Sequence, residues 1–349
     1  MTLCNGKAAV RALVAALAIT AGFGATTGAA RADETRFVLI SHAPDSDSWW
    51  NVIKNAIKQA DEDFNVKTDY RNPPNGDLAD MARLIEQSAA RDYSGVITTI
   101  ADYDVLKNSL GKVTAKKIPL VTMNSGTEEQ SAQLGAIMHV GQPEYVAGQA
   151  AGEKAKAAGV KSFVCVNHYV TNALSFERCR GFADAIGADV KSSMIDSGTD
   201  PTEIQSKVSA YLRNHPKTQA VLTLCPVPAA ATLKALQQMG LAGKLYFSTF
   251  DFSDEIAKGI RAGTIHYAID QQPYLQGYIP VAVLAIVKQD KTTDPVKIRQ
   301  ILQANPKFQA RLAAYGLQPS YGPRNIRSGP GFITKDNLDK VVKYAGQYR

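Results

Sequence analysis

The sequence has 349 residues, a hydrophobic content of 45% and a formal net charge of +7. Its 39 lysine and arginine residues are spread along the chain, which argues against the clustered basic face of a nucleic-acid-binding protein. We expect no nucleic-acid partner, and the length is too great for one comfortable core, which predicts two domains.

The first 32 residues have the pattern of a secretory signal peptide. Lys7 and Arg11 give a basic start, and the apolar stretch 13–25 is too short to cross a bilayer. Ala30 and Ala32 supply small side chains before the expected cleavage point. Cleavage after Ala32 leaves 317 residues with a net charge of +4, and we expect this mature chain to function outside the cytoplasm.

Apolar, β-branched runs alternate with helical patterns in the first half of the mature chain. Strands are expected at 37–41, 66–70, 95–100, 118–123 and 137–140. Helices are expected near 48–63, 77–91 and 103–116. This alternation, with strands that are apolar throughout, is typical of a parallel sheet covered by helices on both faces.

The same alternation restarts near residue 160. Strands are expected at 162–166, 191–195, 220–224, 245–249 and 267–269, with helices near 174–186, 201–213, 227–239 and 254–262. A long helix is expected from Pro273 to Lys288, the periodicity weakens over 291–305, and 321–334 is expected to be a loop before a short strand. The sequence therefore predicts an α/β protein with two successive doubly wound units.

Three cysteines follow the expected cleavage point. Cys165 lies on an expected strand and Cys179 in the next helix, so a disulfide between them is one alternative for an exported protein. Three buried thiols are the other alternative, because spacing alone cannot establish the geometry of a bridge. Since the number is odd, at least one thiol, such as that of Cys225, stays free or pairs between chains.

The residues that follow the expected strands are rich in aromatic and amide side chains. Ligands of open α/β sheets bind beyond these carboxyl ends. The residues concerned are 42–50, 101–103 and 124–125 in the first unit, and 167–169, 196–199, 225–226, 250–252 and 270–272 in the second. Aromatic faces cover the C–H faces of a sugar ring, and amides and carboxylates bond its hydroxyls, so this collection indicates a neutral, hydroxylated ligand.

Six segments, in a fixed order, carry a resemblance to a known family over nearly the whole mature chain. They are Trp49-Trp50, Ile118 to Asn124, Gly148 to Gly152, Phe176 to Phe182, Ser248 to Asp251 and Gly263 to Pro273. Together, behind an export signal, they make the sequence resemble the periplasmic sugar-binding proteins of the ribose-binding type, which serve ABC importers.

The resemblance implies the type I periplasmic binding protein fold, with two doubly wound parallel-sheet lobes. Its three hinge crossings would lie near 141–143, near 271–273 and within 315–330. The N-terminal lobe would contain 33–141 plus about 273–318, and the C-terminal lobe 142–272 plus about 319–349. It also implies a monomeric periplasmic binder, not an enzyme and without a cofactor, that passes a sugar or polyol to an ABC permease. A chemoreceptor is the alternative partner.

The same comparison, together with position after a strand, predicts the ligand-binding residues. They are Asp47, Trp49, Trp50, Asn124, Asn167, His168, Arg178, Cys225, Asp251 and Gln271. Two positions depart from the family pattern: Asn124-Ser125 replaces an aspartate–arginine pair, and Cys225 replaces an asparagine. The pocket is therefore expected to offer fewer hydrogen-bonding groups than a ribose site.

Several of these residues also have a purely structural explanation. The tryptophans fit an apolar helix stripe, Arg178 fits a solvated helix face, Asp251 fits a helix cap, and Asp45 and Asp47 fit a solvated turn. An exported hydrolase would need two suitably spaced carboxylates, and none can be nominated. The histidines show no paired spacing and Cys-x-x-Cys does not occur, so no metal site is expected.

Overall fold

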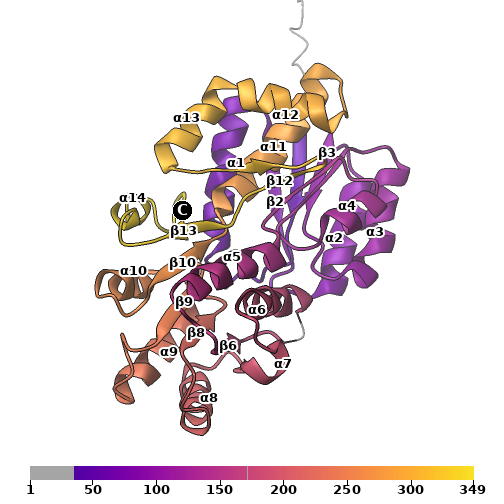
Figure 1. Cartoon of the computed structure of the whole chain (residues 1–349). Helices are drawn as coiled ribbons and strands as arrows, with labels where there is room; N and C mark the ends of the chain where they lie inside the picture. The colour runs from indigo at the N-terminus through magenta and orange to yellow at the C-terminus, as the bar shows by residue number, and fades with distance from the viewer. Residues whose placement is uncertain (1–34, 171) are drawn as a thin grey trace, which may run out of the picture. The chain divides into compact units, whose positions relative to one another are not determined.

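The computed structural model describes residues 35–170 and 172–349, and the expected signal peptide, 1–32, lies outside the described residues. From Thr35 onward the chain forms two β-sheets, each covered by helices (Figure 1). The predicted fold class, two doubly wound units with parallel-dominated sheets, is confirmed.

The first lobe contains a seven-stranded sheet in the order β11-β12-β5-β4-β3-β1-β2. Its strands are β1 (Arg36–Ile40), β2 (Lys67–Arg71), β3 (Gly95–Thr98), β4 (Leu120–Met123), β5 (Met138–Gly141), β11 (Ser320–Tyr321) and β12 (Asn325–Arg327). Its helices are α1 (Trp50–Phe64), α2 (Leu78–Ala89), α3 (Tyr103–Ala115), α4 (Glu128–Gln133), α11 (Pro273–Asp290), α12 (Pro295–Ala304) and α13 (Pro306–Tyr315).

The second lobe contains a six-stranded sheet in the order β13-β10-β9-β8-β6-β7. Its strands are β6 (Phe163–Asn167), β7 (Met194–Asp196), β8 (Ala220–Thr223), β9 (Tyr246–Phe250), β10 (Tyr267–Asp270) and β13 (Gly331–Ile333). Its helices are α5 (Glu144–Ala157), α6 (Ala173–Ile186), α7 (Val190–Ser193), α8 (Pro201–Asn214), α9 (Pro226–Gln238), α10 (Asp254–Arg261) and α14 (Leu338–Val342).

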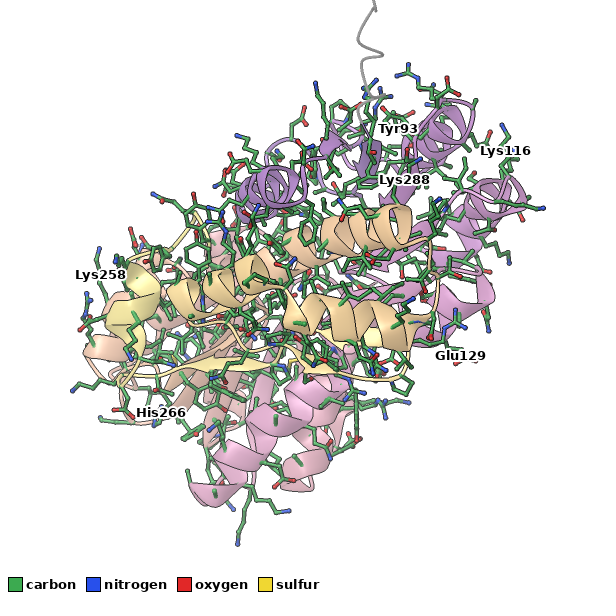
Figure 2. The ribbon with its side chains drawn as sticks, turned by 90° about the horizontal axis from the view of Figure 1, so that it is seen from above. Tyr93, Lys116, Glu129, Lys258, His266 and Lys288 are labelled. Carbon is green, nitrogen blue, oxygen red and sulfur yellow. A yellow bond between two sulfur atoms is a disulfide. The ribbon has the colours of Figure 1, made fainter. Side chains whose placement is uncertain are left out.

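Strand β1 shows why these sheets are covered on both faces. Phe37 and Leu39 pack into a core with α1 and α11, whereas Val38 and Ile40 pack into a separate core with α2 and α3. A strand with apolar side chains on both faces must be covered twice, which the flanking helices do. Charged side chains such as those of Glu129 and Lys258 are exposed and lie at the periphery (Figure 2).

Several elements differ from the prediction. The strand expected at 191–195 begins later, because the short helix α7 precedes β7. Asp189 caps the N-terminus of α7 by accepting a hydrogen bond from the backbone amide of Ser192. Helices α12 and α13, missed where the periodicity weakens, begin after side-chain caps at Asp294 and Asn305, each followed by proline.

The segment after residue 318 was expected to belong wholly to the second lobe, but part of it lies in the first sheet. Strand β12 pairs in parallel with β5 of the first sheet, where Ile326 is buried, and β11 pairs with β12. Only β13 and α14 join the second lobe, and Tyr344 and Tyr348 then pack against the first core. The chain thus exchanges sheets between β12 and β13, later than the boundary near 318.

The sheets are connected where β5, β10 and β12 end. The connecting residues are 142–143, 271–272 and 328–330. The side-chain Nε2 of Gln276 donates to the Ser328 hydroxyl at 3.0 Å and to the Gln271 backbone carbonyl at 3.3 Å. The side-chain Nε2 of Gln272 donates to the Ser328 backbone carbonyl. These bonds tie the second connection to the third, so the two segments form one hydrogen-bonded hinge region. Among the described residues, no helix is long and apolar enough to cross a membrane.

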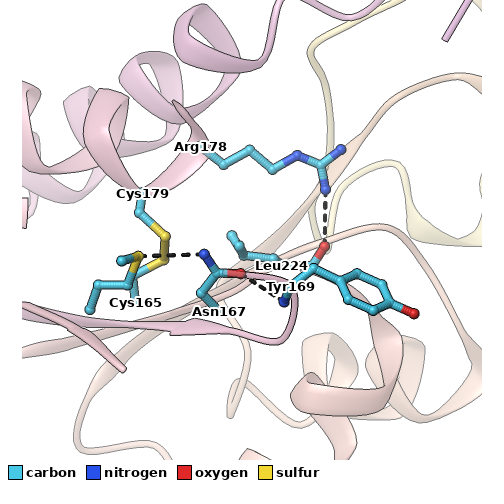
Figure 3. The surroundings of a disulfide bond; sticks show 7 residues. Cys165, Asn167, Tyr169, Arg178, Cys179 and Leu224 are labelled. Atoms are coloured by element: carbon cyan, nitrogen blue, oxygen red, sulfur yellow. Dashed lines mark hydrogen bonds between the residues drawn. A yellow bond between two sulfur atoms is a disulfide. The ribbon is translucent and has the colours of Figure 1, made fainter. Parts of the chain in front are cut away.

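A disulfide joins Cys165 on β6 to Cys179 on α6, with Cα atoms 5.8 Å apart (Figure 3). Both cysteines are fully buried, whereas Cys225 is a free thiol. The bridge fixes α6 against the second sheet next to Arg178, the residue before Cys179.

Replacing both bridged cysteines by alanine is expected to lower the free energy of unfolding by roughly 2–3 kcal/mol, since a short loop is no longer closed in the unfolded chain. Urea unfolding with and without a thiol reductant measures this. The reductant should bring the wild type close to the variant and leave the variant unchanged. A wild type as stable as the variant without reductant would contradict the prediction.

Candidate ligand-binding site

A cavity of about 590 Å³ lies at the carboxyl ends of both sheets. The loops after β1 and β4 supply its first wall, and those after β6, β8, β9 and β10 supply the second. Nine of the ten predicted residues line it: Asp47, Trp49, Trp50, Asn124, His168, Arg178, Cys225, Asp251 and Gln271. The structure therefore brings together residues separated by more than two hundred positions in the sequence.

Asn167 is the exception, because it does not line this cavity. Its side chain is fully buried, its Oδ1 accepts a hydrogen bond from the Tyr169 amide at 2.9 Å, and its Nδ2 lies 3.4 Å from the Met194 sulfur (Figure 3). The amide group shapes the turn after β6 and does not line the cavity.

The two tryptophans take different positions at the start of α1. Trp50 is 3% exposed and packs into the first core, although its edge also reaches the cavity. Trp49 is half-buried, and its ring lies at 5.4 Å from that of Trp50 in an edge-to-face arrangement. Asp47, exposed at the cavity edge, accepts a hydrogen bond from the Trp49 amide at 3.1 Å. Trp49 is thus the more exposed of the two indoles that line the cavity.

Asn124 and Asp251 occupy matching positions in the two lobes. Each directly follows a strand, β4 or β9, and each has a positive φ, 59° and 63°. The backbone amide of Asn124 donates to the Val140 carbonyl on the neighbouring strand, and the backbone amide of Asp251 donates to the Ile269 carbonyl in the same way. Asparagine and aspartate tolerate this left-handed conformation better than other side chains do. The strained turn aims one polar side chain from each sheet at the cavity.

Asp251 has its acidity altered by its surroundings. Burial raises the pKa of its carboxyl from 3.8 to about 6, although the nearby Arg178 charge and a 2.7 Å hydrogen bond from Gln271 Nε2 oppose the rise. Burial costs the charged form solvation that these two partners do not fully replace. Asp251 is therefore a hydrogen-bond acceptor maintained at a cost in stability.

The Asp251→Asn variant is expected to gain stability relative to wild type as the pH rises. Well below pH 3.8 the Asp251 carboxyl is protonated in both the folded and the unfolded chain, so the difference in unfolding free energy between variant and wild type is smallest there. Between pH 4 and 6 the unfolded chain loses that proton and the folded one retains it, so the unfolding free energy of wild type falls. The Asp251→Asn variant has no such proton, so its unfolding free energy lacks this decrease.

Urea unfolding of both proteins at pH 4, 5, 6 and 7.5 tests this difference. Asparagine keeps the positive φ accessible, so the backbone is not the cause of any change. The exposed Asp336→Asn variant is the control and should follow wild type across the range. A stability difference that stays constant with pH would contradict the assignment to Asp251.

Arg178 is held by a buried acidic partner that the sequence analysis missed. Its Nε and Nη2 donate to the two carboxylate oxygens of Glu144 at 2.7 and 2.8 Å, and Nη1 donates to the Leu224 carbonyl at 3.0 Å. The guanidinium also lies over the Phe250 ring at 4.4 Å. Burial alone would lower the pKa of Arg178, but the Glu144 carboxylate raises it, so the arginine stays charged. Its place is the cavity wall rather than a solvated helix face.

Two further predicted residues contribute no charge at neutral pH. Burial, assisted by the Arg178 charge, lowers the pKa of His168 to about 4. Burial and then the Asp251 charge raise the pKa of the Cys225 thiol to about 12. In residues 35–170 and 172–349, no group of three or more His, Cys, Asp or Glu side chains is placed to hold a metal ion.

Besides Glu144, several lining residues escaped the sequence analysis. Among them are Val52, Asn172, Leu174, Ser175 and Pro228. Asn172 could have been identified from its position before α6, whose first turn it caps through the Leu174 amide. Glu144 gave no comparable signal, because an acidic residue in a first helical turn is ordinary.

Two solved structures resemble this fold closely. A carbohydrate transporter from Acidothermus cellulolyticus 11B, in complex with myo-inositol, is 27% identical, covers 90% of this chain and 98% of its own, and gives a TM-score of 0.72. An ABC transporter solute-binding protein from Burkholderia graminis C4D1M, in complex with D-arabinose, is 20% identical, with coverages of 88% and 96% and a TM-score of 0.68. The second likeness shows a shared fold.

The curated proteins add a partial match. The xylose/arabinose-binding protein XylF from Sulfolobus acidocaldarius is 23% identical over 127 residues, which are 35% of this chain and 32% of that relative. The family model described as a periplasmic binding protein domain matches residues 37–292, well over half of the chain. The match confirms the resemblance read from the sequence at the level of the family, so this chain belongs to the periplasmic binding protein family.

Proposed function

We propose that this protein captures a sugar or polyol between its two lobes and delivers it to an ABC importer. The observation that supports this most directly is the cavity itself. It has an indole wall at Trp49 and convergent hydrogen-bonding groups from both sheets, including Asn124, Arg178 and Asp251. Aromatic faces match the C–H faces of a sugar, and the polar groups match its hydroxyls.

Ligand capture in this proposal shifts a hinge equilibrium. A ligand that touches both lobes binds the closed form better than the open one and favours closure by that difference in affinity. The hydrogen-bonded connections around Gln272, Gln276 and Ser328 are where such a movement would be absorbed. The permease would then bind the lobe surfaces of the closed form.

The proposal gives each of these residues a role. Trp49 would stack on the ring, Asp251 and Gln271 would bond its hydroxyls from the second lobe, and Asn124 would do so from the first. Asn124 also donates to Gln276 Oε1 at 2.8 Å, which links a ligand-facing side chain to the hinge region. Export by the signal peptide 1–32 to the periplasm is part of the same proposal.

Thermal unfolding of the purified protein against a panel of sugars and polyols tests the proposal. The first probe is myo-inositol, because the Acidothermus structure contains it, followed by arabinose, xylose, galactose and glucose. A ligand at about 1,000 times its Kd adds about 4 kcal/mol, a rise of several degrees in Tm. The absence of a shift across the panel in ligand-free, refolded protein would sink the sugar assignment.

Recovery of the ligand after incubation separates binding from chemistry. Mass spectrometry should return it unchanged, whereas a cleaved or modified product would favour an exported enzyme. Sensing by a membrane chemoreceptor uses the same cavity, so a direct interaction assay with the permease and the receptor distinguishes those partners.

A further inference from the structure

Arg178 is the one arginine among the described residues that line the cavity, and a neighbouring side chain in the same wall balances its charge. Glu144 and Arg178 form a bidentate ion pair, and their side chains are only 6% and 12% exposed, respectively. Gln142 Nε2 also donates to Glu144 Oε2 at 2.9 Å, which holds the carboxylate toward the arginine. Three of the five N–H bonds of Arg178 are used by protein groups, which leaves two for a ligand.

The other charged groups of the wall are carboxylates. Asp47 lies at the rim and Asp251 lies deeper, and neither takes part in an ion pair with the described residues. Both carboxylates raise the pKa of the Cys225 thiol, so the fields of both reach the same part of the cavity. None of the described lining residues is a lysine, and His168 is neutral at pH 7.

We propose that Glu144 sets the charge selectivity of the cavity: by neutralising Arg178 it makes the site take uncharged polyols and reject their carboxylate counterparts. This inference rests on the proposed function. Hydroxyl groups can accept from the two remaining Arg178 N–H bonds and donate to Asp251 and Asp47 without any change of charge. A sugar acid would instead place its carboxylate near Asp251 and Asp47, neither of which is ion-paired with the described residues, while Glu144 already matches the Arg178 charge.

Paired ligands that differ by one carboxylate give the first test. Calorimetric titration of the full protein with galactose against galacturonate, glucose against glucuronate, and myo-inositol measures both sides of the selectivity. The neutral member of a bound pair should bind at least roughly a hundredfold more tightly than its acid, which corresponds to a like-charge cost of about 2.7 kcal/mol. An acid that binds as tightly as its neutral partner overturns the charge inference and leaves the proposed function standing.

The Glu144→Gln variant gives the second test. The glutamine keeps the shape and leaves the Arg178 charge uncompensated, so the ratio of neutral to acid affinity should fall about tenfold or more. Glu177→Gln is the matched control, since Glu177 pairs with Arg180 on the same helix, half-exposed and outside the cavity lining. It should leave the ratio unchanged.

The outcomes are distinct. A folded Glu144→Gln protein with the wild-type ratio would show that Glu144 does not set the selectivity. If that variant fails to fold, the wild-type pairs still decide whether acids are rejected. If no neutral or acidic ligand of the panel binds wild type, the proposed function itself fails and the selectivity inference fails with it.

Discussion

A Gly148→Ala variant is expected to lose more than about 3 kcal/mol of unfolding free energy and most of its ligand affinity. Gly148 lies where α5 crosses α6, and a Cβ atom built on it would lie 2.1 Å from the carbonyl oxygen of Arg178. Backbone on a neighbouring helix cannot rotate away as a flexible side chain can. The two helices must therefore separate, or the helix that carries Arg178 must bend.

The same crossing explains why the loss should reach the ligand. Glu144 lies one turn before Gly148 on α5, and Arg178 lies opposite on α6, so the glycine sets the spacing across which their ion pair forms. Gly181 makes the reciprocal approach, since a Cβ atom there would lie 2.1 Å from the Tyr145 carbonyl. A wider crossing would draw the guanidinium away from the Glu144 carboxylate.

Gly111→Ala is the matched control for this variant. Gly111 is also inside a helix, α3, but a Cβ atom there would meet no other atom within 4 Å. That change should be neutral or stabilise the protein by about 0.5–1 kcal/mol, because alanine loses less conformational freedom on folding than glycine. Chemical unfolding of the two variants beside wild type decides the matter. Equal stabilities for both would show that the close crossing is not needed.

The fold was predictable because its strands carry an unambiguous pattern. Strands β1 and β8 carry apolar side chains on both faces. Such strands fit only in a sheet that has helices packed on both of its faces. Helices α12 and α13 were missed because their periodicity is weak, with only Ile298 and Leu302 buried in α12. Their caps, Asp294-Pro295 and Asn305-Pro306, were the stronger signal.

The position of the site was predictable for a topological reason. Parallel strands have their carboxyl ends on the same side of a sheet, so the residues after β1 and β4 gather at the end of the first sheet and those after β8 and β9 at the end of the second, whatever their identity. The direction of a side chain is a different matter. Asn167 follows the rule by sequence but points toward Met194, because successive residues of a strand point to opposite faces.

The partners of the site residues could not be read from the sequence. Arg178 was predicted only as a ligand-binding residue, and the structure shows that its guanidinium already donates to Glu144, 34 positions away. That pairing depends on the close approach of α5 and α6, which is set by two glycines whose role shows only in three dimensions. Sequence motifs located the arginine but gave no information on its charge balance.

An Arg178→Met variant should lose about 3–5 kcal/mol of unfolding free energy and at least roughly a hundredfold in ligand affinity. Methionine can fill the space over the Phe250 ring but cannot bond Glu144 or the Leu224 carbonyl. The Glu144 carboxylate, only 6% exposed, is then left without its cation in a site where charge is poorly solvated. The folding cost therefore comes mainly from the partner that remains.

The Glu144→Gln/Arg178→Met double variant separates the two effects. Removal of the stranded carboxylate should restore part of the folding stability, because no unpaired charge remains buried, whereas ligand affinity should stay low, since the cavity still lacks its two free N–H donors. Urea unfolding and calorimetry on the single and double variants complete a double-mutant cycle. A double variant no more stable than Arg178→Met would place the cost in lost packing on Phe250 rather than in the unpaired charge. A double variant that regained wild-type affinity would remove Arg178 from the binding site.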